Sequence, residues 1–128
     1  MALDETILPN LRTVCGLADD DSFDSDLILH SGGAFANMAQ VGVGFGNFTL
    51  KDETQTWSDL LGPEAMLTPI FPAARQYTQL YVRQLFDPPA PTTVTYMEKV
   101  LSELLWRLQM YADELLLEGG IINGNLSE

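Results

Sequence analysis

The stretch "YVRQLFDPPAPTT" (Tyr81–Thr93) contains an amphipathic run that stops at three prolines in four residues. The residue before a proline avoids helical backbone angles, so Asp87 is predicted to be extended and to end a helix. A new helical pattern starts near Thr92 or Thr93. The stretch therefore predicts two helices joined by a rigid structural corner made of Asp87, Pro88 and Pro89.

The helix after this corner is predicted to run to about Leu117. Its apolar residues have the 3-4 spacing of a heptad stripe: Val94, Met97, Leu101, Leu104, Leu108, Tyr111 and Leu115. Trp106, Met110 and Leu117 fall on the opposite side, and a helix that is apolar on both sides must be covered on both. The cover for these three is either the same monomer or a neighbouring subunit, so they are candidate interface residues. Glu103 and Arg107 can form an i,i+4 pair.

Three further helices are predicted before the corner. The first runs from Thr6 to Cys15, capped by Thr6 and stopped by Gly16 with Leu17. The second runs from Phe23 to Gln40 with Ser22 as N-cap, and its apolar stripe is Phe23, Leu27, Ala34, Met38 and Val41. The third runs from Pro69 to Phe86, with one face formed by Ile70, Ala74, Tyr77, Tyr81 and Leu85. Gly32 and Gly33 weaken the second helix and suggest a close helix contact or a kink.

The segment between the second and third helices is predicted to be irregular. "VGVGFGN" (41–47) is typical of a glycine-rich turn, and "NFTL" (Asn47–Leu50) is the only plausible strand. "TQTWSDLLGP" indicates one helical turn, capped by Thr54 or Thr56 and stopped by Gly62-Pro63. The fold class is therefore mainly α, a four-helix domain over residues 1–118 with a short irregular or β segment. Residues 119–128 form a tail whose apolar residues are Ile121, Ile122 and Leu126. The tail either frays or orders on a partner.

Composition limits the function classes. The chain has 128 residues, 46% of them hydrophobic, which fits one folded domain. Six Lys and Arg face 18 Asp and Glu, for a net charge of -12. This charge repels nucleic-acid phosphates and argues against tight or sequence-reading DNA binding. The net negative charge is consistent with a role in solubility alone, or with a surface along which DNA moves without binding. No apolar run approaches the roughly 20 residues of a membrane span, and the acidic N-terminus is unlike a signal peptide.

Several segments suggest a metal, cofactor or catalytic site, but none has the full sequence pattern of such a site. The acidic run Asp19–Asp26 lacks the glycine and glutamate that an EF-hand loop needs, so no metal is expected. "GVGFG" is not a dinucleotide fingerprint, and no cofactor is expected. His30, the sole histidine, fits a packed core residue better than a ligand, and Cys15, the sole cysteine, fits a small buried hydrophobe. A Cys15–His30 nucleophile pair stays open, but no catalytic residue is predicted and the chain is expected not to be an enzyme.

Four segments in order resemble a family of small proteins from tailed bacteriophages with long tails. Phe86-Asp87-Pro88-Pro89 and Glu103-Leu104-Leu105-Trp106-Arg107-Leu108 match the end of one helix and the core of the next. "SFDSDLILHSGGAFANMAQVGVG" and "FTLKDETQTWSDLLG" match the upstream segments. The likeness covers most of residues 6 to about 113, and the family is that of head–tail connectors, also called adaptors or head completion proteins.

The resemblance implies a virion protein assembled in the host cytoplasm and placed at the neck. It implies a homo-oligomeric ring, commonly a dodecamer, that lies below the portal protein, extends the DNA channel and meets a stopper or tail-completion protein. DNA would pass through the lumen without specific binding, and no membrane is implied. The tail from Gly119, with Ile121, Ile122 and Leu126, is the candidate portal-binding segment.

Two alternatives remain. One is another part of the same neck, a stopper or tail-completion protein, although such proteins tend to be β-rich. The other is an acidic helical adaptor or inhibitor that binds a basic partner and is unrelated to the virion.

Overall fold

The computed structural model describes residues 5–18, 20–44, 48–62 and 69–117, with side chains up to Glu114. Within these ranges the chain forms the helices α1 (Ile7–Val14), α2 (Asp24–Gln40), α3 (Trp57–Leu61), α4 (Ile70–Phe86) and α5 (Pro91–Leu117). No strand occurs in the described part, and the mainly α fold class is confirmed. None of the described helices is both long and apolar enough to span a membrane.

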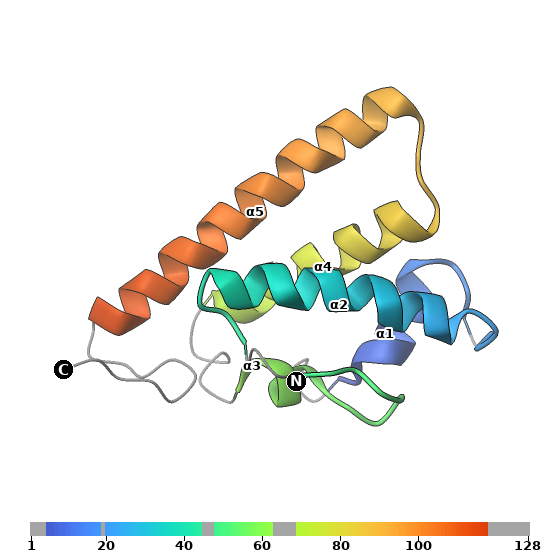
Figure 1. The fold of residues 1–128 in the computed structure, drawn as a ribbon, viewed down its shortest axis with the longest axis horizontal. Coiled ribbons are helices and arrows are strands. Elements are labelled where there is room, and N and C mark those ends of the chain that lie inside the picture. Colours follow the sequence, from blue (N-terminus) through green and yellow to red (C-terminus); the bar gives the residue numbers. More distant parts are fainter. Residues whose placement is uncertain (1–4, 19, 45–47, 63–68, 118–128) are drawn as a thin grey trace.

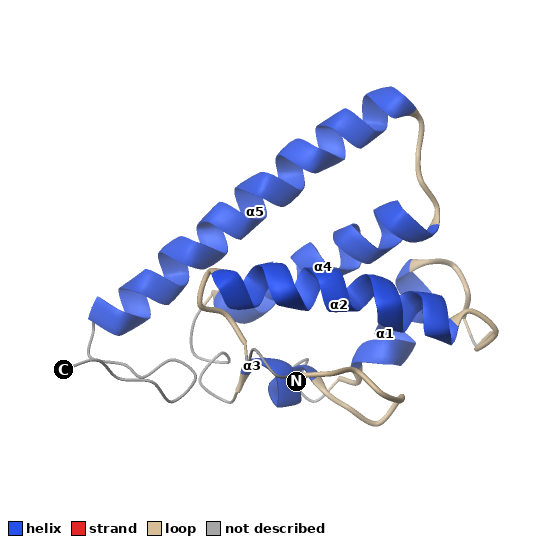
Figure 2. Ribbon diagram, viewed as in Figure 1, coloured by secondary structure: helices blue, strands red, loops and turns tan. Residues whose placement is uncertain are grey.

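The helices form three layers (Figures 1 and 2). α2 and α4 pack against each other in the middle, and each of them also contacts α1 on one side. On the other side the long α5 lies across α4 and α2. The chain reverses direction between α4 and α5, so the corner at residues 87–90 sets how these two helices meet.

The core lies between these layers. Its largest fully buried side chains include Trp57, Ile7, Leu11, Leu27, Met38 and Leu108. Edge-to-face aromatic pairs connect the segment 48–62 to the helices. The ring centroids of Phe35 and Phe48 lie 5.4 Å apart, and those of Trp57 and Phe71 lie 6.3 Å apart. The short segment 48–62 is therefore held to the helical core by its apolar side chains.

The helix boundaries agree closely with the sequence, whereas the predicted cap of α2 is wrong and that of α1 is only partly correct. Thr6 stands at the N-cap of α1 but its side chain accepts no capping hydrogen bond. Its backbone is instead paired with Thr56 in an isolated antiparallel bridge. At α2 the N-cap is Phe23, not Ser22, and the Ser22 N–H donates to Asp20 Oδ1 at 2.9 Å. Asp24 and Asp26 do lie in the first turn of α2, as predicted.

The predicted stops and the short helix are confirmed. Gly16 has φ +79°, and the Leu17 N–H donates to Arg12 O at 2.8 Å, which is a Schellman stop. α2 ends in the same way at Gly42, with φ +92°. α3 begins with a capping box between Thr56 and Asp59.

The predicted strand is wrong. Residues 48–50 form no strand, and Asn47 lies outside the described residues. Leu50 is 3% exposed and Phe48 packs against Phe35, so the apolar pattern of this segment reflects anchoring to the core without a partner strand. The one backbone bridge in the described part joins Thr6 to Thr56.

The predicted helix faces are partly correct. In α2, Leu27, Ala34 and Met38 are fully buried, but Phe23 is 40% exposed. In α4, Leu85 is 42% exposed, while Thr78 and Val82 are buried in addition to the predicted Ile70, Ala74 and Tyr77.

In α5, Leu101, Leu104 and Leu108 are buried, but Val94 and Met97 are only half-buried. No residue of α5 before Leu101 is buried, so α5 packs loosely over its first turns, next to the corner where Leu85 lies.

Candidate functional site

α4 ends at Phe86, directly before the predicted corner, although the ψ of Asp87 falls short of the predicted extended conformation. Asp87 leaves the helix with φ −140° and ψ 81°, and its N–H still donates to Arg83 O at 3.0 Å. The next helix begins at Pro91, and the Val94 N–H donates to Ala90 O at 2.9 Å. The two prolines at 88 and 89 thus occupy a short extended link with no N–H to donate, which limits the conformations that the link can adopt.

The outer face of α5 is the second predicted feature. Trp106 is 58% exposed and Met110 is 45% exposed, so the described part of the monomer does not cover them. Tyr96, on the same helix, is 67% exposed. Around them are charged residues, including the Glu103–Arg107 pair, whose Nη2–Oε2 distance is 3.2 Å. Leu117 belongs to α5, but its side chain lies outside the described ones.

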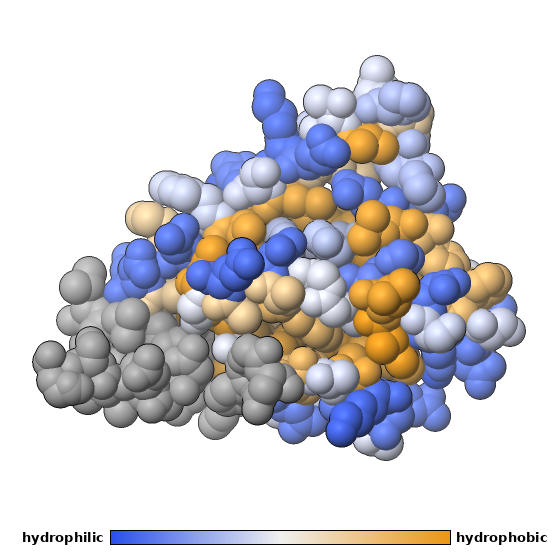
Figure 3. Space-filling model, in the orientation of Figure 1, coloured by the Kyte–Doolittle hydropathy of each residue, from blue (hydrophilic) through white to orange (hydrophobic). Residues whose placement is uncertain are grey.

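The surface of the molecule has an uneven distribution of apolar groups. Figure 3 shows apolar side chains between α5 and α2 and over the neighbouring ends of α2 and α4, whereas mainly polar side chains follow the outer edge of α5. Trp106 and Met110 lie beside the Glu103–Arg107 pair in the sequence of α5, and exposed apolar residues next to charged ones are typical of protein–protein contacts.

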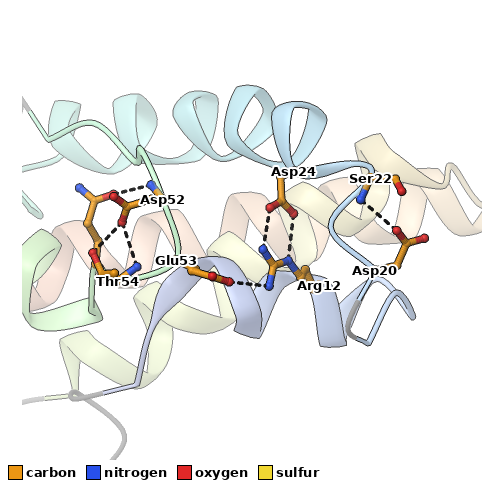
Figure 4. Close-up of polar contacts among 8 residues, drawn as sticks. Arg12, Asp20, Ser22, Asp24, Asp52, Glu53 and Thr54 are labelled. Carbon is orange, nitrogen blue, oxygen red and sulfur yellow. Dashed lines mark hydrogen bonds and ion pairs between the residues drawn. The ribbon is translucent and has the colours of Figure 1, made fainter.

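An ion-pair cluster centred on the buried Arg12 joins α1, α2 and the segment before α3 (Figure 4). Arg12 is 8% exposed and binds Asp24 through two hydrogen bonds, of 2.9 Å from Nε and 2.6 Å from Nη2. It also donates to Glu53 Oε1 at 3.0 Å. The hydrogen bond to Asp24 is the largest cause that raises the pKa of Arg12 above its ordinary value, against the opposing effect of burial. This cluster was not predicted, because its members lie up to 41 residues apart in the sequence.

The residues considered for chemistry are Cys15, His30 and the acidic run Asp19–Asp26, of which Asp19 lies outside the described residues. Cys15 is half-buried, and burial raises the pKa of its thiol, which disfavours the reactive thiolate. His30 is half-buried at the edge of the core, where the neighbouring Ser31 is fully buried instead. Among the described residues no group of His, Cys, Asp or Glu is arranged to hold a metal ion. Asp20 and Asp24 act in the local turn and the ion-pair cluster.

The remaining predicted residues cannot be placed. Ile121, Ile122 and Leu126 of the tail lie outside the described residues.

Comparison with protein families decides the class of this chain. A family model described as "Phage connector protein" matches residues 7–115. The chain belongs to the phage connector protein family. The match runs from the first residue of α1 almost to the end of α5, and so includes the corner and the outer face of α5. No curated protein and no solved structure matches the chain. Family membership supports a structural role in joining head and tail of a phage particle, in a family that is structural and not enzymatic.

Proposed function

We propose that this connector forms a homo-oligomeric ring below the portal, most simply a dodecamer, and joins the capsid to the tail at the virion neck. The observation that carries the proposal is the family match over residues 7–115, which covers α1 to α4 and all but the last two residues of α5. In this arrangement the ring continues the channel through which the genome is ejected, and a stopper or tail-completion protein binds its other end. Assembly takes place in the host cytoplasm.

The outer face of α5 supplies the proposed contact between subunits. A ring requires heterologous contacts, in which one surface of each subunit meets a different surface of the next. Trp106 and Met110 are large apolar residues that the described monomer leaves exposed, and both types are enriched in interface cores. Leu117 is proposed to extend this surface by one or two turns. Burial of these side chains in a neighbour would stabilise the ring by the hydrophobic effect.

The corner fixes the wedge that such a ring needs. A ring closes only if the angle between neighbouring subunits is constant. A flexible link between α4 and α5 would widen the range of values that this angle takes. Asp87, Pro88 and Pro89 restrict it, because each proline fixes its own φ and Pro88 constrains Asp87.

The acidic surface suits a channel for DNA. With 18 acidic and six basic residues per subunit, a ring would present repeated negative charge, which repels phosphates. DNA would then slide through without specific binding. The tail from residue 119 is proposed to order on the portal, as a separate segment from the domain at 1–118.

A gene disruption tests the proposed role. A phage that lacks this protein should produce DNA-filled heads and complete tails that fail to join, and supplying the protein in trans should restore tailed particles. Normal tailed particles in its absence would refute the proposal. Binding to a basic host protein without presence in particles would instead support the acidic-adaptor alternative. The stopper alternative has less support, because no strand occurs in the described residues.

A further inference from the structure

A groove of about 440 Å³ lies where α2, α4 and α5 meet. Its polar lining comes from Asn37 on α2, from Tyr77, Tyr81 and Gln84 on α4, and from Glu98 and Ser102 on α5. This volume falls in the range of roughly 300–1,000 Å³ that is typical of binding sites. The groove is separate from the corner and from Trp106 and Met110, which do not line it.

The groove has unused hydrogen-bond acceptors and no cation. Gln84 Oε1 is buried and has no hydrogen-bond partner within the described part of the chain. Glu98 is exposed and forms no ion pair with any described residue. A buried acceptor without a donor costs about 1–3 kcal/mol, so a donor that reaches Gln84 would be favoured. Rotation about the terminal amide torsion of Gln84 would bring Oε1 to the groove, where a guanidinium could donate to it.

Two tyrosines form the aromatic wall of the groove. The rings of Tyr77 and Tyr81 lie 5.8 Å apart between centroids, tilted by 36°. Asn37 Nδ2 donates to Tyr77 Oη at 3.1 Å and fixes that ring. Tyr81 can lie against α2 because residue 33 is glycine: a Cβ there would be 2.6 Å from Tyr81 Oη. Aromatic faces attract cations by about 0.5–2 kcal/mol, depending on desolvation.

We propose that this groove binds an arginine side chain of a basic partner protein, with the guanidinium between Glu98, Gln84 and the Tyr81 ring. The planar guanidinium has five N–H donors, so it can pair with a carboxylate, donate to an amide oxygen and stack on an aromatic ring at once. Lysine offers a point charge and no plane, so arginine fits this lining better. The proposal does not depend on the ring: it holds for any basic partner.

The charge of the chain favours a different protein over a second copy as the source of this arginine. Three of the four arginines, Arg12, Arg75 and Arg107, are engaged in ion pairs within the chain, and Arg83 is exposed. A second copy also has a net charge of -12, so it does not complement the acidic surface as a basic protein does. A partner rich in arginine is instead attracted to the acidic surface before it docks.

Nuclear magnetic resonance on the full-length, ¹⁵N-labelled protein tests the proposal. The probe is an end-blocked Ala-Arg-Ala tripeptide, compared with tripeptides that carry citrulline, which is nearly isosteric and uncharged, or aspartate. We expect the arginine peptide alone to shift the side-chain amide signals of Gln84 and Asn37 and the backbone signals near Tyr81 and Glu98. Glu98→Gln should weaken its binding at least threefold, whereas Glu114→Gln, the same change at another exposed site on α5 that forms no ion pair with a described residue, should not.

Four results would overturn the proposal. They are equal shifts with citrulline, shifts with aspartate, shifts that map outside the groove, and equal effects of Glu98→Gln and Glu114→Gln. Concentration-dependent shifts of the groove signals without peptide would show that a second copy occupies the groove, and would also refute it. None of these results bears on the gene-disruption phenotype, so the two proposals fail independently.

Discussion

Gly33 on α2 lies directly against Tyr81 on α4: a Cβ at position 33 would be 2.6 Å from Tyr81 Oη and 3.2 Å from two ring carbons. Gly32, its neighbour in the sequence, has nothing within 4 Å of its ideal Cβ. The pair of glycines predicted a close contact or a kink in this helix. The structure confirms the close contact and assigns it to Gly33 alone.

Gly33→Ala should therefore destabilise the protein and Gly32→Ala should not. Overpacking costs about 1–3 kcal/mol, which outweighs the gain in helix propensity of up to about 1 kcal/mol. At Gly32 only the gain applies. Urea unfolding of both variants measures this difference, and Gly33→Ala combined with Tyr81→Phe should recover part of the loss, because the hydroxyl makes the closest contact. Equal stability of the two alanine variants would contradict the packing at Gly33.

The Arg12 cluster predicts unequal effects of its two carboxylates. Asp24→Asn removes the charge from the two-point contact and should lower the free energy of unfolding by about 1–3 kcal/mol. Glu53 has a side chain that is 61% exposed, so Glu53→Gln should cost less than about 1 kcal/mol. Urea unfolding again gives both values. If Glu53→Gln cost as much as Asp24→Asn, the cluster would not be centred on the Arg12–Asp24 contact.

The outer face of α5 predicts a separation between folding and assembly. Trp106→Ala and Met110→Ala remove exposed side chains, so the free energy of unfolding of the monomer should change by no more than about 0.5 kcal/mol. Complementation of the disrupted phage should nevertheless fall sharply. Leu29→Ala is the matched control, since Leu29 is 72% exposed on α2 and takes no part in the proposed contact. Full complementation by the Trp106→Ala, Met110→Ala double variant would remove this face from the subunit interface.

The corner makes a similar prediction. Replacing both Pro88 and Pro89 by alanine should lower the free energy of unfolding by up to about 1 kcal/mol for each residue, through the entropy of the unfolded chain. The yield of tailed particles should fall further than this loss explains, because the angle between α4 and α5 is no longer fixed. Pro72→Ala, in the first turn of α4, is the control for loss of a proline outside the corner. Normal particle yield from the corner variant would show that its rigidity is not needed.

Cys15 should react slowly in the folded protein. Burial raises the pKa of its thiol, and Arg83 and Asp87 act on it in opposite directions with smaller effect. Because the folded pKa is the higher one, this thiol favours the folded state below the unfolded pKa of about 8.5, and the contribution is lost as the pH rises through the folded pKa. Alkylation by iodoacetamide at about pH 8 should be slower in buffer than in urea, where the thiolate fraction is larger. Equal rates would contradict the burial.

The helices could be predicted from the sequence because their signals are local. Heptad spacing and the Pro-Pro corner place α4 and α5 to within one or two residues, and Leu101, Leu104 and Leu108 are buried as their spacing predicts. The first turns of α5 break that pattern. Val94 and Met97 continue the stripe, but they lie next to the corner, where the described α5 has no buried residue.

Contacts between distant segments could not be predicted. Serine is a residue type that favours the N-cap position, which is why Ser22 is predicted there. The first turn of α2 is instead held by Arg12 on α1, which binds Asp24. The groove combines residues of three helices, and neither the exposed Glu98 nor the half-buried Gln84 has a sequence signal that marks it. The proposed interface is an intermediate case: the two-sided pattern of α5 marks Trp106 and Met110, and the structure leaves both exposed.

The most direct test of the account is cryo-electron microscopy of purified particles. The neck density should contain a ring of helical subunits immediately below the portal. The outer face of α5 at Trp106 and Met110 should be buried against the next subunit, and the tail after Gly119 should be ordered on the portal. Particles whose neck density contains no copy of this fold would contradict the central claim.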